Sequence, residues 1–305
     1  MTLALSTAWY PRSDARIAPT LQAIQRMGFE RIEIGVSTVR FRLKKFKKWL
    51  DRCGLKVVSV HNVCAERKLD EANRRGDWLA STDENERRKG VEVTLESIAN
   101  AKELGAAAVV LHLGSPPIPE KWEKQNHLYR IAREGAAAEI ELGVTRAELL
   151  AQRAELAPAC LEAACRSLEE LLEKSAGIQL GIECRMGWHE LPSLEELGTL
   201  LQRFPDPRVG YWHDVGHAVI QGYMGLADEL DWLRRHGRRT LGAHLHDVKD
   251  GTRDHYPPGL GQVDFEPILE LLPAEAILVM EISSGFIEEE ITLGKRRLEE
   301  LSFCD

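Results

Sequence analysis

The hydrophobic and polar positions of this chain alternate in a regular order, with short apolar runs separated by longer amphipathic segments. Apolar runs of this length are typical of parallel strands that are buried on both faces. The intervening segments show helical periodicity, as in Ala15–Met27, Glu266–Leu272 and Ile287–Leu301. The alternation predicts an α/β fold with a closed parallel sheet. The predicted strands are Leu3–Ser6, Arg31–Gly35, Lys56–His61, Ala107–His112, Ile178–Glu183, Arg208–Asp214, Thr240–Leu245 and Ala276–Ile282.

Eight strand and helix units fit a single (β/α)8 TIM barrel, and 305 residues are enough for one such barrel. One connection is longer than the others, with about 65 residues between His112 and Ile178. Within it, residues 114–128 are predicted to form a loop near the active site, and Val144–Lys174 a long helix. Thr145 and Glu148 could form a capping box at the start of this helix. We therefore expect one domain, residues 1–305, with a long helical insertion after strand four.

Composition narrows the class of protein further. The net charge of −8 argues against a general surface for nucleic acids. The first residues, MTLALSTAWYPR, lack the basic and apolar regions of a secretory signal, and no apolar stretch approaches the roughly 18 residues of a membrane span. The six cysteines form no CxxC pair and are expected to be reduced thiols. A cytoplasmic protein without a membrane partner is the expectation.

Residues that commonly bind metals lie at the last or the penultimate position of six of the predicted strands. In a (β/α)8 barrel the carboxyl ends of all strands meet at one rim, where catalytic residues lie. Carboxylate oxygens combined with imidazole nitrogens suit a divalent cation such as Mn, Mg, Co or Zn. The last four strands therefore predict a metal site at the rim. The six strand-end residues are His61, His112, Glu183, Asp214, His244 and Glu281.

Three longer stretches carry a resemblance to a known family. They are HDVGHA (213–218), AHLHDVKDG (243–251) and DHYPPGLGQVDF (254–265). They resemble the xylose-isomerase-like TIM-barrel superfamily, which includes sugar phosphate isomerases and epimerases and the related endonuclease-IV-like AP endonucleases. The similarity extends from RIEIG at 31–35 to MEISSG at 280–285. It implies that Glu183, Asp214, His244 and Glu281 bind the metal, although His246 remains an alternative to His244.

The resemblance gives a second set of residues two alternative roles. In the sugar epimerases the corresponding side chains contact the substrate, whereas in the nucleases they hold further metal ions. The nuclease pattern has an aspartate two residues before its last histidine, and this chain has Arg253 there. Asp254 and His255 are expected in a loop before a glycine-rich turn. The full set is His61, His112, His217, Asp254 and His255.

Other residues near the strand ends are candidates for the walls of the pocket. Arg185, Trp188 and His189 follow Glu183 in a predicted loop, and Trp122 could stack on a sugar face. Glu33 near the end of strand two could lie near the substrate or pair with a neighbouring barrel residue.

The activity that the resemblance implies is divalent-metal-dependent isomerisation or epimerisation of a small ketose or related polyhydroxy ketone. Glu183 and Glu281 would be the catalytic residues, removing and returning protons while an enediolate forms. The expected partner is a small sugar, and a homo-oligomer remains open.

Two other functions remain as alternatives. A zinc-dependent AP endonuclease acting on abasic DNA would use the same rim and would need basic loop residues. The candidates are interleaved with acids and are Arg67, Lys68, Lys121, Lys124, Arg74 and Arg75. The acidic net charge disfavours nucleic acid as the partner. A non-catalytic sugar-binding barrel is the third alternative, and the intact set of carboxylates argues against it.

Overall fold

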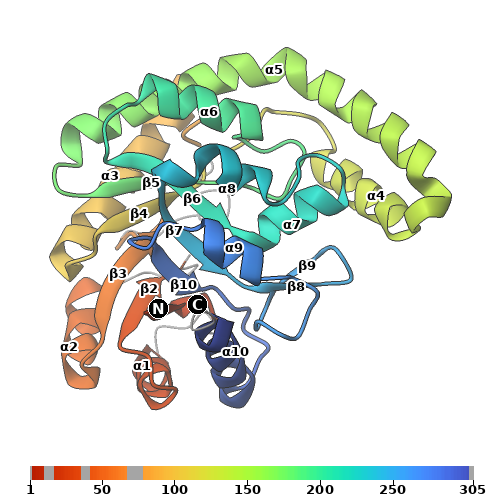
Figure 1. The fold of residues 1–305 in the computed structure, drawn as a ribbon. Helices are drawn as coiled ribbons and strands as arrows, with labels where there is room; N and C mark the ends of the chain where they lie inside the picture. The colour runs from red at the N-terminus through yellow and green to blue at the C-terminus, as the bar shows by residue number, and fades with distance from the viewer. Residues whose placement is uncertain (1, 10–16, 36–41, 67–77, 302–305) are drawn as a thin grey trace.

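A closed barrel of parallel strands forms the centre of the computed structural model, which describes residues 2–9, 17–35, 42–66 and 78–301 (Figure 1). Neighbouring strands follow the order β1-β10-β7-β6-β5-β4-β3-β2 around the barrel. This confirms the predicted (β/α)8 barrel, and the predicted strand ends differ from the observed ones by at most two residues. The strands are β1 Leu3–Ser6, β2 Arg31–Ile34, β3 Lys56–His61, β4 Ala108–Leu111, β5 Gln179–Glu183, β6 Val209–Asp214, β7 Thr240–Leu245 and β10 Ile277–Met280.

Helices surround the barrel and bury its outer face (Figure 1). Several begin at clear caps: Asp83 accepts hydrogen bonds from two backbone N–H groups of α3, and Ser193 and Glu196 form a capping box on α6. The helices outside the insertion are α1 Ile17–Arg26, α2 Leu43–Cys53, α3 Glu84–Leu104, α6 Leu194–Arg203, α7 Val215–Tyr223, α8 Asp231–His236, α9 Glu266–Leu271 and α10 Glu288–Leu301.

The insertion between β4 and β5 is more helical than the sequence predicted. Helix α4 (Lys121–Arg133) occupies part of the segment predicted as a loop, because Leu128 and Ile131 form a buried apolar face on it. The long helix α5 is Glu139–Lys174, so it begins before Val144, and the predicted capping box at Thr145 is wrong. Figure 1 shows α5 extending across the outside of the barrel beyond the ends of its neighbours.

A two-stranded antiparallel hairpin, formed by β8 (Asp247–Lys249) and β9 (Arg253–Tyr256), projects from the rim after β7. Asp254 and His255 therefore lie in a strand, and their predicted loop conformation is wrong. Asp250 and Gly251 at the turn both have positive φ, 52° and 70°, which is the conformation of a type I′ turn. Asp-Gly is a preferred pair for this turn, so the signal was present in the sequence.

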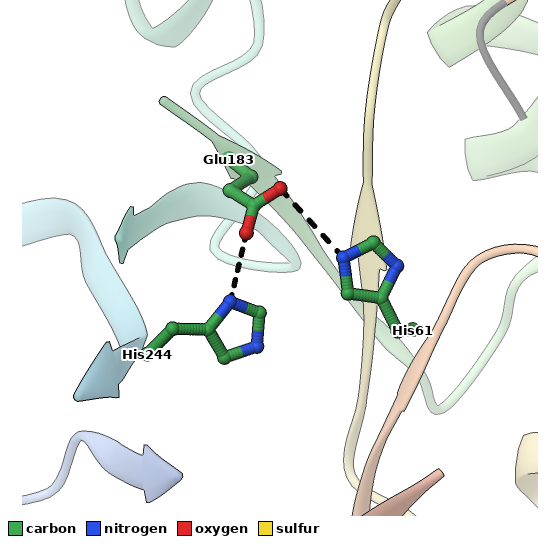
Figure 2. A group of neighbouring side chains, drawn as sticks. All are labelled: His61, Glu183 and His244. Carbon is green, nitrogen blue, oxygen red and sulfur yellow. Dashed lines mark hydrogen bonds and ion pairs between the residues drawn. The ribbon is translucent and has the colours of Figure 1, made fainter. Parts of the chain in front are cut away.

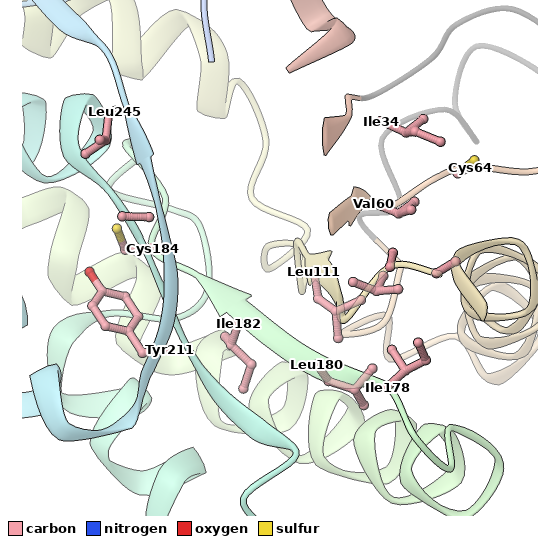
Figure 3. Close-up of a cluster of buried hydrophobic side chains, with 14 of the residues drawn as sticks. Ile34, Val60, Cys64, Leu111, Ile178, Leu180, Ile182, Cys184, Tyr211 and Leu245 are labelled. Atoms are coloured by element: carbon pink, nitrogen blue, oxygen red, sulfur yellow. The ribbon is translucent and has the colours of Figure 1, made fainter. Parts of the chain in front are cut away.

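Side chains on the outer face of the strands pack against the helices. Figure 3 shows Leu180 and Ile182 of β5 and Cys184, which directly follows it, among other apolar residues of this layer. The alternation along the strand then directs Gly181 and Glu183 to the inside of the barrel.

Trp212 fills the interior of the barrel, and two glycines on neighbouring strands make room for it. The ring is completely buried with Ala4, Ala108, Val110 and Val279 around it. A Cβ atom would lie 2.8 Å from the ring at Gly181 and 2.5 Å from it at Gly242. The base of the barrel is therefore a packed layer, and the polar side chains lie above it.

Gly242→Ala should destabilise the protein by about 1–3 kcal/mol, because the added methyl group overlaps Trp212 in a filled interior. Thermal and urea unfolding measure this change. Gly143→Ala in α5 is the matched control, since a Cβ atom at this position would meet no other atom within 4 Å among the described residues, and it should leave stability unchanged or raise it slightly. Equal stability of the two variants would contradict this packing.

Some predictions fall outside the described residues. These concern Arg67, Lys68, Arg74 and Arg75. The assignment of residues 1–305 to one domain stays a prediction. Within the part of the chain that the structure describes, no helix combines the length and apolar character needed to cross a membrane.

Candidate metal centre in the mouth of the barrel

The six predicted strand-end residues all lie at the carboxyl ends of barrel strands and are buried. Four of them are within β3, β5, β6 and β7, while His112 and Glu281 directly follow β4 and β10. Because the strands are parallel, their carboxyl ends meet at one mouth. Polar groups that lie far apart in the sequence are therefore close together in space.

His244 lies at the centre of this group. Its Nδ1 atom is 2.7 Å from Oε1 of Glu183, 3.2 Å from Oε2 of Glu281 and 3.5 Å from Oδ2 of Asp214. One ligand atom from each of these four residues lies within 4.8 Å of the others. Figure 2 shows that one Glu183 oxygen faces His244 and the other faces His61.

Glu33 orients His244 from the opposite side of the ring. Its Oε2 atom is 3.2 Å from Nε2 of His244 and accepts a hydrogen bond of 2.8 Å from the Ser59 hydroxyl. A carboxylate on one imidazole nitrogen commonly fixes a histidine whose other nitrogen binds a metal. Of the two roles considered for Glu33, the geometry favours pairing with a barrel neighbour.

The electrostatics of the mouth depend on close contacts between acids and histidines. Burial alone would raise the pKa of the Glu183 carboxyl, but His112 and His244 hold it well below its usual value. His217 and His246 have the same effect on the pKa of Asp214 against its burial. Burial would lower the pKa of His244, yet Glu281 and Glu33 raise it well above the ordinary value. The acids and histidines of the mouth therefore stabilise one another's charged forms.

His246 has a different place from His244. Its Nε2 atom lies 2.9 Å from Oδ1 of Asp214, and its Nδ1 atom accepts a hydrogen bond from the backbone N–H of His255. A Cβ atom at Gly216 would overlap the His246 ring. Glycine at this position of HDVGHA thus leaves room for a histidine that connects Asp214 to the β8–β9 hairpin.

A second group of ligand-type residues lies beside the first. His217 in the first turn of α7 and His255 in β9 each place Nδ1 3.0 Å from a backbone carbonyl, of Cys184 and Glu281 respectively. Their Nε2 atoms lie 3.8 and 3.7 Å from Oδ2 of Asp254. Two histidines oriented by carbonyls around a carboxylate could bind a cation or the oxygens of a ligand.

Arg185, which the sequence indicated only as a wall residue, reaches into the mouth. Its Nη1 atom lies 2.9 Å from Oε2 of Glu183 and 2.7 Å from Nε2 of His112, and its Nε atom donates to Oε1 of Glu190 at 3.1 Å.

His189, two residues after Gly187, is fully buried, and burial lowers its pKa to about 4. His189 packs against Trp122 with ring centroids 4.7 Å apart. Trp122 is about half exposed.

Asp247 was not identified from the sequence as a site residue, although it organises the glycine-rich turn. Its two oxygens accept hydrogen bonds of 2.8–2.9 Å from four backbone N–H groups, those of Val248, Gly259, Gly261 and Val263. A Cβ at Gly261 would overlap this carboxylate. The motif DHYPPGLGQVDF is therefore built around one buried aspartate.

Asp247→Ala should lower the free energy of unfolding by roughly 3 kcal/mol, because four backbone donors would lose a charged acceptor. Chemical denaturation gives the change, and Asp51→Ala at an exposed position of α2 should shift stability by no more than about 0.5 kcal/mol. If Asp247→Ala were as stable as the parent protein, the turn would not depend on this carboxylate.

Comparisons with known proteins agree with the barrel fold. The family model described as xylose isomerase-like TIM barrel matches residues 21–293, so the chain belongs to this family. No curated protein sequence matches it. The resemblance seen in the three sequence stretches is thereby confirmed.

Solved structures with a similar fold include several sugar epimerases. A D-tagatose 3-epimerase-like protein superposes with a TM-score of 0.69 at 20% identity, covering 99% of this chain and 97% of that chain. The 3-keto-D-glucoside 4-epimerase from E. coli gives 0.65 at 15%, and the D-psicose 3-epimerase from Clostridium cellulolyticum H10 gives 0.68 at 13%; both cover 100% of each chain. At these identities the similarity establishes the fold.

Proposed function

We propose that this protein is a metal-dependent isomerase or epimerase that acts on a small ketose or related polyhydroxy ketone. The observation that carries the proposal is the convergence of Glu183, Asp214 and Glu281 on Nδ1 of His244 in a buried barrel mouth. The family and the sugar epimerases among the structural neighbours support the same class of reaction.

The four residues suit a divalent ion. They offer three carboxylate oxygens and one imidazole nitrogen within 4.8 Å of one another, a donor set that Mn, Mg, Co and Zn accept. When bound, such an ion would act as a Lewis acid that polarises the carbonyl group of the substrate. Glu33 would keep Nδ1 of His244 directed at it through the contact at Nε2.

Glu183 and Glu281 would move the proton. They lie at the ends of β5 and β10, which are separated in the barrel by β6 and β7. The pKa of each is lowered, despite burial, by neighbouring histidines, so each is held in the ionised form that a general base requires. One carboxylate would remove the proton from the carbon beside the carbonyl, giving an enediolate. The other, after taking up a proton from water, would return that proton on the opposite face.

The remaining predicted residues would bind the oxygens of the substrate. His61 and His112 line the β3–β4 side of the mouth, and the group of His217, Asp254 and His255 lines the side of the hairpin. The last group also supports the second candidate function, a zinc-dependent AP endonuclease, because it could hold a further ion. Arg253 at the position of the nuclease aspartate, together with the acidic net charge, makes the epimerase the preferred proposal.

Glu183→Gln and Asp214→Asn should each weaken binding of manganese at least tenfold, because each replaces an anionic ligand with a neutral amide. His244→Ala should weaken it more than His246→Ala, since His246 contacts only Asp214 among the four proposed ligands. Isothermal titration calorimetry of the apoprotein measures both effects, with Glu103→Gln on α3 as an exposed control. Unchanged affinity in both acid variants would contradict this metal centre.

The protein should catalyse exchange of deuterium into a ketose at the carbon beside the carbonyl. A panel of ketoses is incubated in deuterated water with manganese, and NMR follows the label. Glu281→Gln should reduce the exchange rate at least a hundredfold, because general acid–base catalysis contributes about 10²–10⁴. Glu103→Gln should not change it.

Two other results would decide against this reaction. If no ketose exchanges and the protein nicks abasic DNA in a zinc-dependent manner, the nuclease is the correct function. If Glu281→Gln exchanges deuterium at the parent rate, Glu281 does not carry the proton.

A further inference from the structure

The two oxygens of Glu183 have different surroundings. Oε1 faces His244 at 2.7 Å and belongs to the proposed metal centre. Oε2 points to the other side of the mouth, 3.7 Å from Nε2 of His61 and 2.5 Å from Nε2 of His112 (Figure 2 shows His61). Glu183 therefore lies on the boundary between two polar regions.

The region around Oε2 has the composition of a cation site of its own. His61, Glu183 and His244 also bring ligand atoms within 4.8 Å of one another, and His112 stands next to them with its ring 4.6 Å from that of His61. Two imidazoles and a carboxylate are a common set for zinc. An ion on this side would need Oε2 of Glu183 as its anionic ligand.

Arg185 already makes the contacts that such an ion would need. Nη1 lies within hydrogen-bonding distance of both Oε2 of Glu183 and Nε2 of His112. The guanidinium is held from behind by Glu190, and the Arg185 carbonyl accepts a hydrogen bond from Gln221. An arginine is always protonated and cannot be lost from the site as a metal ion can.

We propose that Arg185 is a built-in cation that takes the place of a metal ion beside Oε2 of Glu183. It excludes an ion from the region of His61, His112 and Glu183, and it keeps Oε1 directed at His244. Arg185 is thus a positioning residue for a carboxylate that binds the metal and moves the proton. This inference rests on the proposed function, since it assumes that the metal centre lies on the Oε1 side.

The test is the number of zinc ions bound per chain, measured by elemental analysis after equilibration with zinc and desalting. Arg185→Met should bind one ion more than the parent protein, because removal of the guanidinium frees Oε2 and the His112 nitrogen. The double variants Arg185→Met/His112→Ala and Arg185→Met/His61→Ala should return to the parent number. Arg185→Lys retains the charge and should not gain an ion.

Controls separate this result from general damage. Arg203→Met removes an arginine that pairs with Glu162 and Glu169 on the outside of the barrel, and it should leave the number unchanged. His112→Ala in the parent background should also leave it unchanged, because Arg185 rather than an ion contacts His112. This variant decides the question even if Arg185→Met fails to fold.

Failure of the inference differs from failure of the proposed function. If the parent protein binds metal through Asp214 and Glu281 but Arg185→Met gains no ion, Arg185 does not replace a metal, and the metal centre stands. If His112→Ala loses one ion from the parent protein, an ion rather than Arg185 occupies this region, and the inference is wrong. If the parent protein binds no divalent ion, the proposed metal centre itself is wrong.

Discussion

Three buried carboxylates gathered around one imidazole are the constraint on which the rest of this structure depends. Glu183, Asp214 and Glu281 converge on Nδ1 of His244, and Glu33 contacts its other nitrogen. Ionised acids removed from water are unfavourable unless positive charge and hydrogen bonds compensate for their desolvation. The proposed divalent ion would supply positive charge to these acids.

The barrel strands position the acids of the mouth, and the packed residues below and above the acids hold these strands and loops in place. Beneath the acids, Trp212 fills the interior because Gly181 and Gly242 leave space for its ring. Above them, Asp247 gathers four backbone N–H groups and fixes the turn that follows the hairpin. His246 connects this hairpin to Asp214. A change in the hairpin would thus act directly on an acid of the mouth.

The strands and the ligand-type residues at their ends could be predicted from two features of the sequence. These are the length of the apolar runs and the position of the polar residues at the ends of those runs. A buried parallel strand is a short apolar run, and its last one or two residues lie at the rim, so the positions of Glu183, Asp214 and His244 followed from the pattern. The role of Arg185 could not be predicted, because His112 is 73 positions away in the sequence. Helix α4 was missed because Leu128 on its buried face belongs to an apolar cluster that includes residues of α5, α7 and β8, far from it in the sequence.

The hairpin and Asp247 show two further features that are difficult to predict from the sequence. The Asp250-Gly251 turn had a recognisable signal, but two short polar strands beside it have no clear apolar alternation. Asp247 accepts hydrogen bonds from backbone groups up to 16 positions away. In the sequence, only the glycines of the turn indicate such contacts. The conformation of a polar loop is determined by contacts that local periodicity does not encode.

The most direct measurement of the central idea is X-ray diffraction from crystals equilibrated with manganese, with data collected at the absorption edge of the metal. An anomalous peak is predicted within coordination distance of Glu183, Asp214, Glu281 and Nδ1 of His244. The absence of a peak at full manganese saturation, or a peak that lies away from these four residues, would contradict the proposed metal centre.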